Sequence, residues 1–354
     1  MAGKLCHEHP AIRRALLEWF RAHARALPWR GTGDPYAVWV SEVMLQQTQV
    51  ATVIPFYQRF MAAFPTISHL AQAPLEQVLE LWSGLGYYRR ARHLREAAEM
   101  LVDKFGRRLP QDYAGLRTLP GIGDYTAKAV LSIAFNQPYA VLDGNVARVV
   151  ARLFAQRGNL HQSDFRQRVE RELTALLSAR SPGDFNQALM ELGQTVCLPR
   201  GPRCWACPLS NWCQGCRSGN PEALPLPRPR RAAESHHLAV ALLRQGKRVA
   251  MARGLGDGLL DDLWNFPAAF GRTPEEALEA LRGKLCLLTR VPFTVAEPTA
   301  EFRHGITYRS IQGRVYPVQA ARAIRHASIR WFELQQLPQA AISQLARKIA
   351  QKIA

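Results

Sequence analysis

Residues 197–213, with the sequence CLPRGPRCWACPLSNWC, hold four cysteines in a short stretch that three prolines keep from forming a helix. The four are Cys197, Cys204, Cys207 and Cys213. Chance clustering of buried core cysteines explains such spacing poorly. A disulfide pair would suit a secreted protein, but the first residues of the chain lack the apolar core of a signal peptide. Thiolates at these spacings instead favour a soft metal centre, either zinc or an iron–sulfur cluster.

The choice between zinc and iron depends on Cys216. Cys204 with Cys207, and Cys213 with Cys216, form two C-x-x-C pairs, which are typical of a four-cysteine zinc site. The pairs are closer together than the roughly 15–20 residues usual for zinc, and Cys197 would have no role. The alternative set of ligands is Cys197, Cys204, Cys207 and Cys213, which would surround a cubane cluster. Cys216 would then not be a ligand. Spacing therefore favours the cluster, with zinc as the alternative.

The chain is strongly basic. Its 354 residues are enough for two domains, and its net charge of +18 is spread along the chain. Nucleic acid is the partner that such a charge favours, although a basic surface without a specific partner is the alternative. No run of about 18 apolar residues predicts a membrane span. Free cysteines beside a metal loop predict a reducing compartment, so we expect a cytoplasmic location, nucleoid-associated if the source is bacterial.

A lone carboxylate stands in an apolar segment near the N-terminus. Residues 36–50 predict a buried helix, and Glu42 lies among its apolar residues. Burial raises the pKa of a carboxyl group, so that it holds a proton near neutrality as a general acid must. The alternative is a helix acid that reaches solvent.

A glycine hairpin lies between two predicted helices. Leu119–Gly123 separates a short helix at 112–117 from a longer one at 124–135. Backbone N–H groups of such a turn, together with the following helix N-terminus, form an anion site suited to a DNA phosphate. Contacts of this kind position a protein on DNA without reading its sequence.

Two further positions have both a structural and a functional interpretation. Asp143 could be the N-cap of the helix that follows it, or could present its carboxylate to a pocket. Tyr87 follows a glycine turn and precedes several arginines, which suits stacking on bases, although ordinary packing explains it equally well.

Composition and periodicity predict a multi-domain protein. Residues 1–216 contain no convincing strand and predict an all-helical domain. Residues 217–235 are rich in proline and arginine and predict a linker. Residues 236–354 predict a smaller α+β domain, with strands at 238–243, 248–252 and 306–318 and helices at 274–282 and 339–353.

Together these segments resemble the adenine DNA glycosylases of the MutY type, within the endonuclease III-like helix–hairpin–helix superfamily. Residues 39–48 (WVSEVMLQQT) resemble the family's catalytic-glutamate helix, and residues 119–123 resemble its hairpin. Residues 142–146 (LDGNV) resemble its catalytic-aspartate segment. The cysteine spacing is that of the superfamily's iron–sulfur loop, which strengthens the cluster interpretation.

The resemblance implies an enzyme that flips adenine out of double-stranded DNA, where it lies opposite 8-oxoguanine or guanine, and hydrolyses its N-glycosidic bond. Glu42 would protonate the base, Asp143 would stabilise an oxocarbenium-like sugar, and Asn145 would order the site. The cofactor would be one [4Fe–4S] cluster on the four cysteines of residues 197–213. We expect a monomer without membrane attachment.

The resemblance also assigns pocket and DNA contacts. Those residues are Arg25, Leu27, Trp29, Arg30, Gln47, Tyr87, Gly121, Gly123 and Gln187. Relatives that also cleave the DNA backbone carry a lysine two residues after the second hairpin glycine. Here that residue is Tyr125, and a phenol cannot form an imine, so a monofunctional glycosylase is expected. Lys128, one turn further on, leaves weak lyase activity open.

The C-terminal domain resembles the family's Nudix-like domain. Residues 263–267 (LWNFP) carry the likeness, with Asn265 in place of the common acid. The glutamate-rich metal box of Nudix hydrolases is missing, so a recognition domain is expected. The loop that usually carries Phe-Ser-His is Ile306-Thr307-Tyr308, which leaves the strength of 8-oxoguanine discrimination open. Rival hypotheses are a bifunctional endonuclease III-like glycosylase and a non-enzymatic DNA-binding protein.

Overall fold

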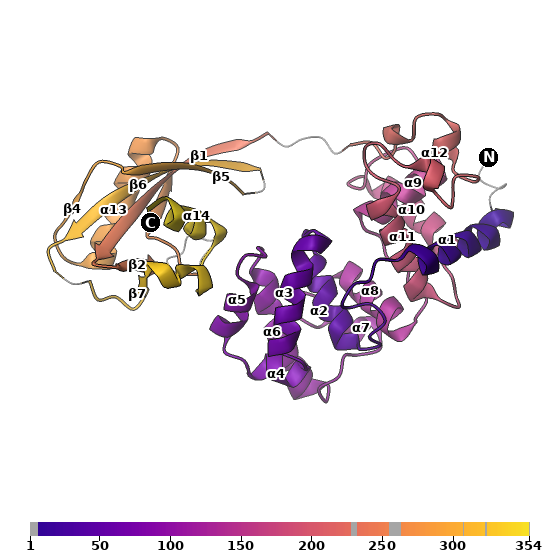
Figure 1. Ribbon diagram of the computed structural model, residues 1–354, viewed down its shortest axis with the longest axis horizontal. Helices are drawn as coiled ribbons and strands as arrows, with labels where there is room; N and C mark the ends of the chain where they lie inside the picture. Colours follow the sequence, from indigo (N-terminus) through magenta and orange to yellow (C-terminus); the bar gives the residue numbers. More distant parts are fainter. Residues whose placement is uncertain (1–5, 228–231, 255–262, 307, 323, 354) are drawn as a thin grey trace. The chain divides into compact units, whose positions relative to one another are not determined.

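The computed structural model describes residues 6–227, 232–254, 263–306, 308–322 and 324–353 (Figure 1). The chain divides into two compact units. The first comprises residues 1–72 and 93–229, and the second comprises residues 73–92 and 230–354. Among the described helices, none combines the length and apolarity needed to cross a bilayer.

The first unit is helical. Its helices are α1 (His9–His23), α2 (Pro35–Leu45), α3 (Val50–Ala63), α4 (Ile67–Gln72), α7 (Tyr113–Arg117), α8 (Asp124–Phe135), α9 (Gly144–Leu153), α10 (Ser163–Leu176), α11 (Pro182–Thr195) and α12 (Gln214–Arg217), together with most of α6 (Arg89–Lys104). No strand occurs among the described residues of this unit, so the predicted all-helical domain is confirmed.

Helix α2 is almost entirely buried within the first unit. Asp34 caps its N-terminus by accepting a hydrogen bond from the Tyr36 amide at 2.9 Å, and Pro35 occupies the first turn. Nine of its eleven residues are buried, from Tyr36 to Met44. A helix that is apolar all round belongs in a core, and α2 packs directly against α8 and α3. Its single acid is therefore held away from water.

Helix α11 packs closely against two neighbours. A Cβ placed on Gly183 would lie 2.5 Å from the Ser132 carbonyl oxygen of α8. A Cβ placed on Gly193 would lie 2.7 Å from the Cβ of Asn145 on α9. Such distances leave no room for a methyl group, so the glycines set how near the helices approach. The apolar core around them comes largely from α1 and α8 to α11.

The second unit is built on a seven-stranded sheet in the order β4-β6-β1-β2-β7, with β3 paired to β1 and β5 paired to β6. The strands are β1 (Glu234–Gln245), β2 (Arg248–Ala252), β3 (Ala268–Gly271), β4 (Phe293–Val295), β5 (Ala300–Ile306), β6 (Arg309–Ala320) and β7 (Ile329–Glu333). Its helices are α5 (Leu75–Trp82), α13 (Pro274–Thr289) and α14 (Gln344–Ile353). The central pair β1–β6 is parallel, in register at Val240 and Val315.

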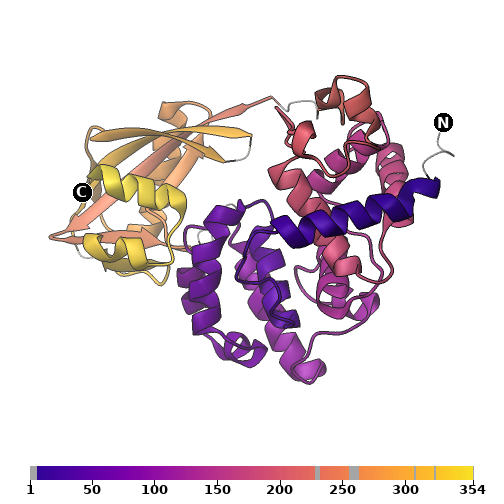
Figure 2. The same ribbon diagram turned by 45° about the vertical axis from the view of Figure 1, so that its right-hand side comes forward.

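Both faces of this sheet are covered. Successive strand side chains point to opposite faces, and in β1 Leu238 and Val240 join the cluster that contains α14. The alternate residues Ala239 and Ala241 join the cluster that contains α13. Figure 2 shows α14, in yellow, lying along the sheet. The predicted α+β domain is confirmed.

Residues 73–92 are part of the second unit through contacts with its C-terminal segment. The Ser83 hydroxyl donates to the Ile342 carbonyl at 3.0 Å, and the Gln344 side-chain amide donates to the Gly84 carbonyl at 2.9 Å. The indole of Trp264 donates to Glu76 at 3.3 Å. The turn that precedes Tyr87 is therefore fixed by the start of α14.

Candidate active site

Glu42 lies in the middle of α2 and is only 6% exposed. Burial is the largest influence on its carboxyl and raises its pKa to about 7; a hydrogen bond from Tyr125 and the charge of Arg30 lower the pKa, and the charge of Asp143 raises it. Within the part of the chain that the structure describes, Oε2 has no hydrogen-bond partner. Near neutral pH this group holds a proton that it can donate.

Asp143 is both an N-cap and a pocket residue, so its two interpretations hold together. Its Oδ1 accepts from the Val146 amide at 2.6 Å, and its Oδ2 accepts from the Asn145 side-chain amide at 3.0 Å. Asn145 is fixed in turn by Arg148, which donates to its Oδ1 at 3.0 Å. The carboxylate is thereby oriented at the N-terminus of α9.

One cavity of about 1120 Å³ brings these groups together. The predicted residues that line it are Arg25, Glu42, Gln47, Gly121, Gly123, Tyr125, Asp143 and Asn145. They come from α2 and the turn that follows it, the hairpin, α8, the start of α9 and the loop after α1. A carboxyl that holds a proton and an oriented carboxylate thus face one space large enough for a nucleobase.

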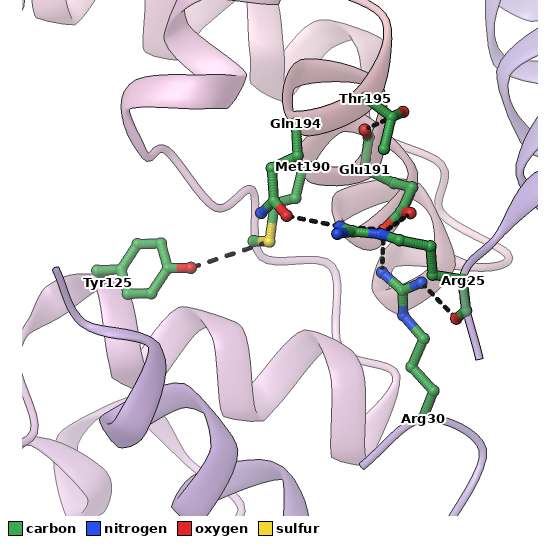
Figure 3. Close-up of polar contacts among 7 residues, drawn as sticks. All are labelled: Arg25, Arg30, Tyr125, Met190, Glu191, Gln194 and Thr195. Atoms are coloured by element: carbon green, nitrogen blue, oxygen red, sulfur yellow. Dashed lines mark hydrogen bonds and ion pairs between the residues drawn. The ribbon is translucent and has the colours of Figure 1, made fainter. Parts of the chain in front are cut away.

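Tyr125 stands on the first turn of α8 and closes one side of the cavity. Its hydroxyl donates to the Met190 sulfur at 3.9 Å (Figure 3). Burial, then the charges of Glu42 and Asp143, raise its pKa well above the usual value, so it stays a neutral phenol. Lys128, the nearest candidate amine considered from the sequence, forms an ion pair with Asp124 at 3.0 Å.

Other predicted pocket residues do not line the cavity wall. Leu27 and Trp29 are buried, and the Trp29 ring packs edge-on against Tyr57 at 5.2 Å. Arg30 lies behind the wall, where it contacts Glu191, and Gln187 is partly buried on α11. Trp29 is thus a packing residue in this arrangement of the chain.

The two residues expected to enter the DNA stack both have left-handed backbone conformations. Gln47 has φ of 56° and Tyr87 has φ of 50°. Residues other than glycine adopt this region rarely, and such strain gathers at functional positions. Tyr87 belongs to the second unit and is 48% exposed. Tyr308, also in that unit, is partly buried with Arg309 over its ring, whereas Thr307 lies outside the described residues.

Several residues of the site were missed from the sequence. They are Arg148, Met190, Glu191 and Gln194. Glu191 gave the same signal as Glu42, an acid within an apolar helical run. Its partners Arg25 and Arg30 are about 160 residues away, and only the fold joins them.

Family models match two parts of the chain. Residues 40–177 match the HhH-GPD superfamily of base excision DNA repair proteins, and residues 239–352 match the NUDIX domain. The adenine DNA glycosylase of Homo sapiens is 34% identical, covering 97% of this chain and 74% of its own length. That of Rattus norvegicus is 35% identical, covering 96% and 77%.

The chain belongs to the adenine DNA glycosylase family. It is therefore an enzyme of base excision repair, and the recognition made from the sequence is confirmed.

Solved structures of DNA repair enzymes are similar to about 60% of the chain. A thermostable thymine-DNA glycosylase has a TM-score of 0.54 and 26% identity, covering 60% of this chain and 98% of that chain. A non-covalent endonuclease III–DNA complex has a TM-score of 0.50 and 26% identity, covering 60% and 97%. DNA is accordingly the partner of this adenine DNA glycosylase family member.

The cysteine loop of the enzyme gathers thiols beside a buried cation. Burial is the largest of the influences that raise the pKa of Cys207 to about 12; a hydrogen bond from the Leu209 backbone opposes it, and the charges of Cys197, Cys213 and Cys204 add to it. Arg152, only 2% exposed, donates to the Cys197 sulfur at 3.4 Å. If all of these thiols lost their protons, the thiolates would repel one another. The iron ions of a cluster carry the positive charge that would offset this repulsion, so the cysteines fit an iron–sulfur cluster.

Two further observations concern the thiols of this loop. Among the described residues, no three His, Cys, Asp or Glu side chains are set to hold a single metal ion. Cys216 lies beside two of the predicted ligands. Its backbone amide donates to the Cys213 sulfur at 3.4 Å, and its thiol shares a hydrogen bond with the Cys204 thiol. Cys216 therefore lies in the same group of thiols as Cys204 and Cys213.

Proposed function

We propose that this enzyme hydrolyses the N-glycosidic bond of adenine opposite 8-oxoguanine or guanine in double-stranded DNA, without cutting the strand. The observation that supports this most is the pair of carboxyl groups in one cavity. Glu42 holds a proton near neutral pH, whereas both oxygens of Asp143 accept hydrogen bonds. Two carboxyl groups in such different surroundings suit an acid and a charge-stabilising partner.

In the proposed reaction, adenine leaves the base stack and enters the cavity. Glu42 donates its proton to a ring nitrogen of the base, which makes adenine a better leaving group. As the glycosidic bond breaks, positive charge develops on the sugar, and the Asp143 carboxylate stabilises it. Water then adds to the sugar and gives up a proton to the Glu42 carboxylate, which restores the acid and leaves an abasic site.

Monofunctional action rests on the finding that, among the described residues that line the cavity, none is a lysine. Tyr125 stands where a Schiff-base lysine would be needed, and it stays a neutral phenol. Lys128 is occupied by its ion pair with Asp124. Both facts support hydrolysis by water over imine formation.

Recognition of the mispair involves both units. The hairpin with Gly121 and Gly123 would bind a DNA phosphate at the N-terminus of α8. Gln47 and Tyr87 would enter the stack beside the partner base. The Nudix-like domain, which retains Tyr308 at the turn between β5 and β6, would contact the oxidised guanine.

The proposed cofactor is one [4Fe–4S] cluster held by Cys197, Cys204, Cys207 and Cys213. It would fix the loop that carries Arg200 and Arg203, which would meet the DNA backbone. Iron and sulfide analysis of the purified enzyme would test this proposal, with four of each per chain expected. One zinc per chain and no sulfide would overturn it.

A single-turnover assay tests the proposed reaction. Duplexes would carry adenine opposite 8-oxoguanine, adenine opposite guanine, or an oxidised thymine. We expect release of adenine alone, no product trapped by borohydride, and a loss of about 10²–10⁴-fold in rate for Glu42→Gln. Release of the oxidised thymine with borohydride trapping would favour a bifunctional enzyme. Undiminished adenine release by the variant would overturn the role of Glu42.

A further inference from the structure

A second buried carboxylate lies behind the cavity wall on α11. The side chain of Glu191 is 1% exposed and contacts two arginines that follow α1 (Figure 3). Arg25 donates to both of its oxygens, at 2.5 and 3.0 Å, and Arg30 donates to its Oε2 at 2.7 Å. One carboxylate thus faces two guanidinium groups.

Arg30 is held from three sides. One of its terminal nitrogens donates to Glu191, and the other donates to the Arg25 carbonyl at 3.0 Å. Its guanidinium carbon lies 5.1 Å above the Phe20 ring. Its Nε is buried and has no hydrogen-bond partner among the described residues. The arginine is therefore fixed in place while its Nε–H remains without an acceptor among the described residues.

Glu191 is ionised in this setting. Burial alone would raise its pKa, but hydrogen bonds from Arg25 and Arg30 outweigh burial and bring the pKa below the usual value. Near neutral pH an ionised carboxylate accepts stronger hydrogen bonds from the two guanidinium groups than a protonated carboxyl group would.

Glu42 is a second carboxyl group on which the charge of Arg30 acts. Its Oε2 is buried without a partner among the described residues. The groups that act on it are Tyr125 from α8, Asp143 at the start of α9, and Arg30 from the loop before α2. If the Arg30 side chain turned toward Glu42, it could donate a hydrogen bond to Oε2.

We propose that Glu191 is a positioning residue for base excision: by holding Arg25 and Arg30 it prevents Arg30 from forming an ion pair with Glu42. The two carboxyl groups compete for one guanidinium, and Glu191 keeps it. This inference rests on the role of general acid proposed above for Glu42. Its consequence is that Glu42 retains the proton that it donates to the base.

The test is the pH dependence of adenine release under single turnover. A general acid works only while protonated, so the rate falls as the pH rises through the pKa of Glu42. In Glu191→Gln the released Arg30 favours ionised Glu42. We expect the fall in rate to move to lower pH by about one unit, while the rate at acidic pH approaches that of the wild type.

Companion variants keep the inference testable if Glu191→Gln folds poorly. Arg30→Gln retains the pair between Arg25 and Glu191 and removes the competing cation, so its fall in rate should move to higher pH. The double variant with both changes should reverse the shift seen in Glu191→Gln. Glu170→Gln is the matched control, because Glu170 pairs with Arg166 at 3.0 Å on the surface of α10. It should leave the profile unchanged.

The outcomes separate the inference from the proposed function. If the wild type releases adenine but neither Glu191→Gln nor Arg30→Gln moves the profile, Glu191 has no such role. A uniform loss of rate at every pH in Glu191→Gln, with no shift in Arg30→Gln, would likewise overturn it. If the wild type releases no adenine from any duplex, the proposed function itself fails.

Discussion

Burial of Glu42 gives the folded and unfolded chains different affinities for one proton. The pKa is about 7 in the folded chain, against an ordinary value of 4.5. Between these values the folded chain keeps a proton that the unfolded chain loses. The stability contributed by this group is therefore complete below about pH 4.5 and is lost as the pH rises through 7.

Glu42→Gln should remove this loss. Raising the pH from 5 to 8 should cost the wild type about 2–3 kcal/mol of unfolding free energy through Glu42, and the variant should be spared that cost. Urea denaturation at both pH values would measure the difference, with Glu170→Gln as a surface control. If the two chains lose equal stability over this range, Glu42 is not held in the protonated state.

Individual residues were predictable where a local pattern carried their chemistry. Glu42 was an acid in an apolar helix, and Asp143 preceded a helix that it could cap. Glu191 was equally anomalous, but its significance depends on arginines that approach it only in the folded chain. Thr307 and the reading of 8-oxoguanine remain predictions.

At the scale of helices, the approach of α11 to α9 positions the site. Gly193 lies against the Cβ, carbonyl carbon and carbonyl oxygen of Asn145. The Asn145 side chain in turn donates a hydrogen bond to Asp143. A methyl group at Gly193 would push the N-terminus of α9 and displace both residues.

Gly193→Ala should therefore cost about 1–3 kcal/mol of unfolding free energy and reduce the single-turnover rate. Gly283→Ala is a matched control, since Gly283 lies in α13 and a methyl group added there would meet no other atom within 4 Å. That change should stabilise by about 0.5–1 kcal/mol and leave the rate unaltered. Equal stability and activity of the two variants would contradict the packing argument. Denaturation and rate measurements on the same preparations decide between them.

Helices with strong boundary signals were predicted well. The predicted helix at 124–135 matches α8, and the predicted strand at 248–252 matches β2. The predicted strand at 306–318 begins too early, because β5 ends at Ile306 and β6 begins at Arg309. Strands β3, β4, β5 and β7 were missed, since three- to seven-residue segments carry little periodicity and are stabilised by their neighbours.

At the scale of the whole molecule, the net charge of +18 should govern DNA affinity. Each phosphate contact releases counterions, so the logarithm of the affinity for undamaged duplex should fall linearly with the logarithm of salt concentration. Arg203→Ala should reduce the steepness by about one if the cysteine loop meets the backbone. Arg168→Ala is the control, because Asp164 already balances Arg168 at 2.8 Å. A flat salt response would remove the electrostatic argument.

The domain order followed from composition, but the path of the chain between the units did not. A change of period near residue 236 marks the α+β domain, and a proline-rich segment precedes it. Nothing in residues 73–92 indicates that they belong with a sheet that begins about 140 residues later. Their contacts with Ile342 and Gln344 exist only after the C-terminal segment has folded.

Because residues 73–92 contact the C-terminal segment, the C-terminal domain cannot be exchanged between related proteins independently of those residues. The turn that presents Tyr87 is encoded in the first third of the gene, yet its anchors lie in the last fifteen residues. A hybrid joined at the proline-rich segment would pair one ancestor's turn with another ancestor's C-terminal helix. In such chimaeras the turn before Tyr87 would lack its matching contacts. Exchange should succeed best when residues 73–92 and the C-terminal segment are transferred together.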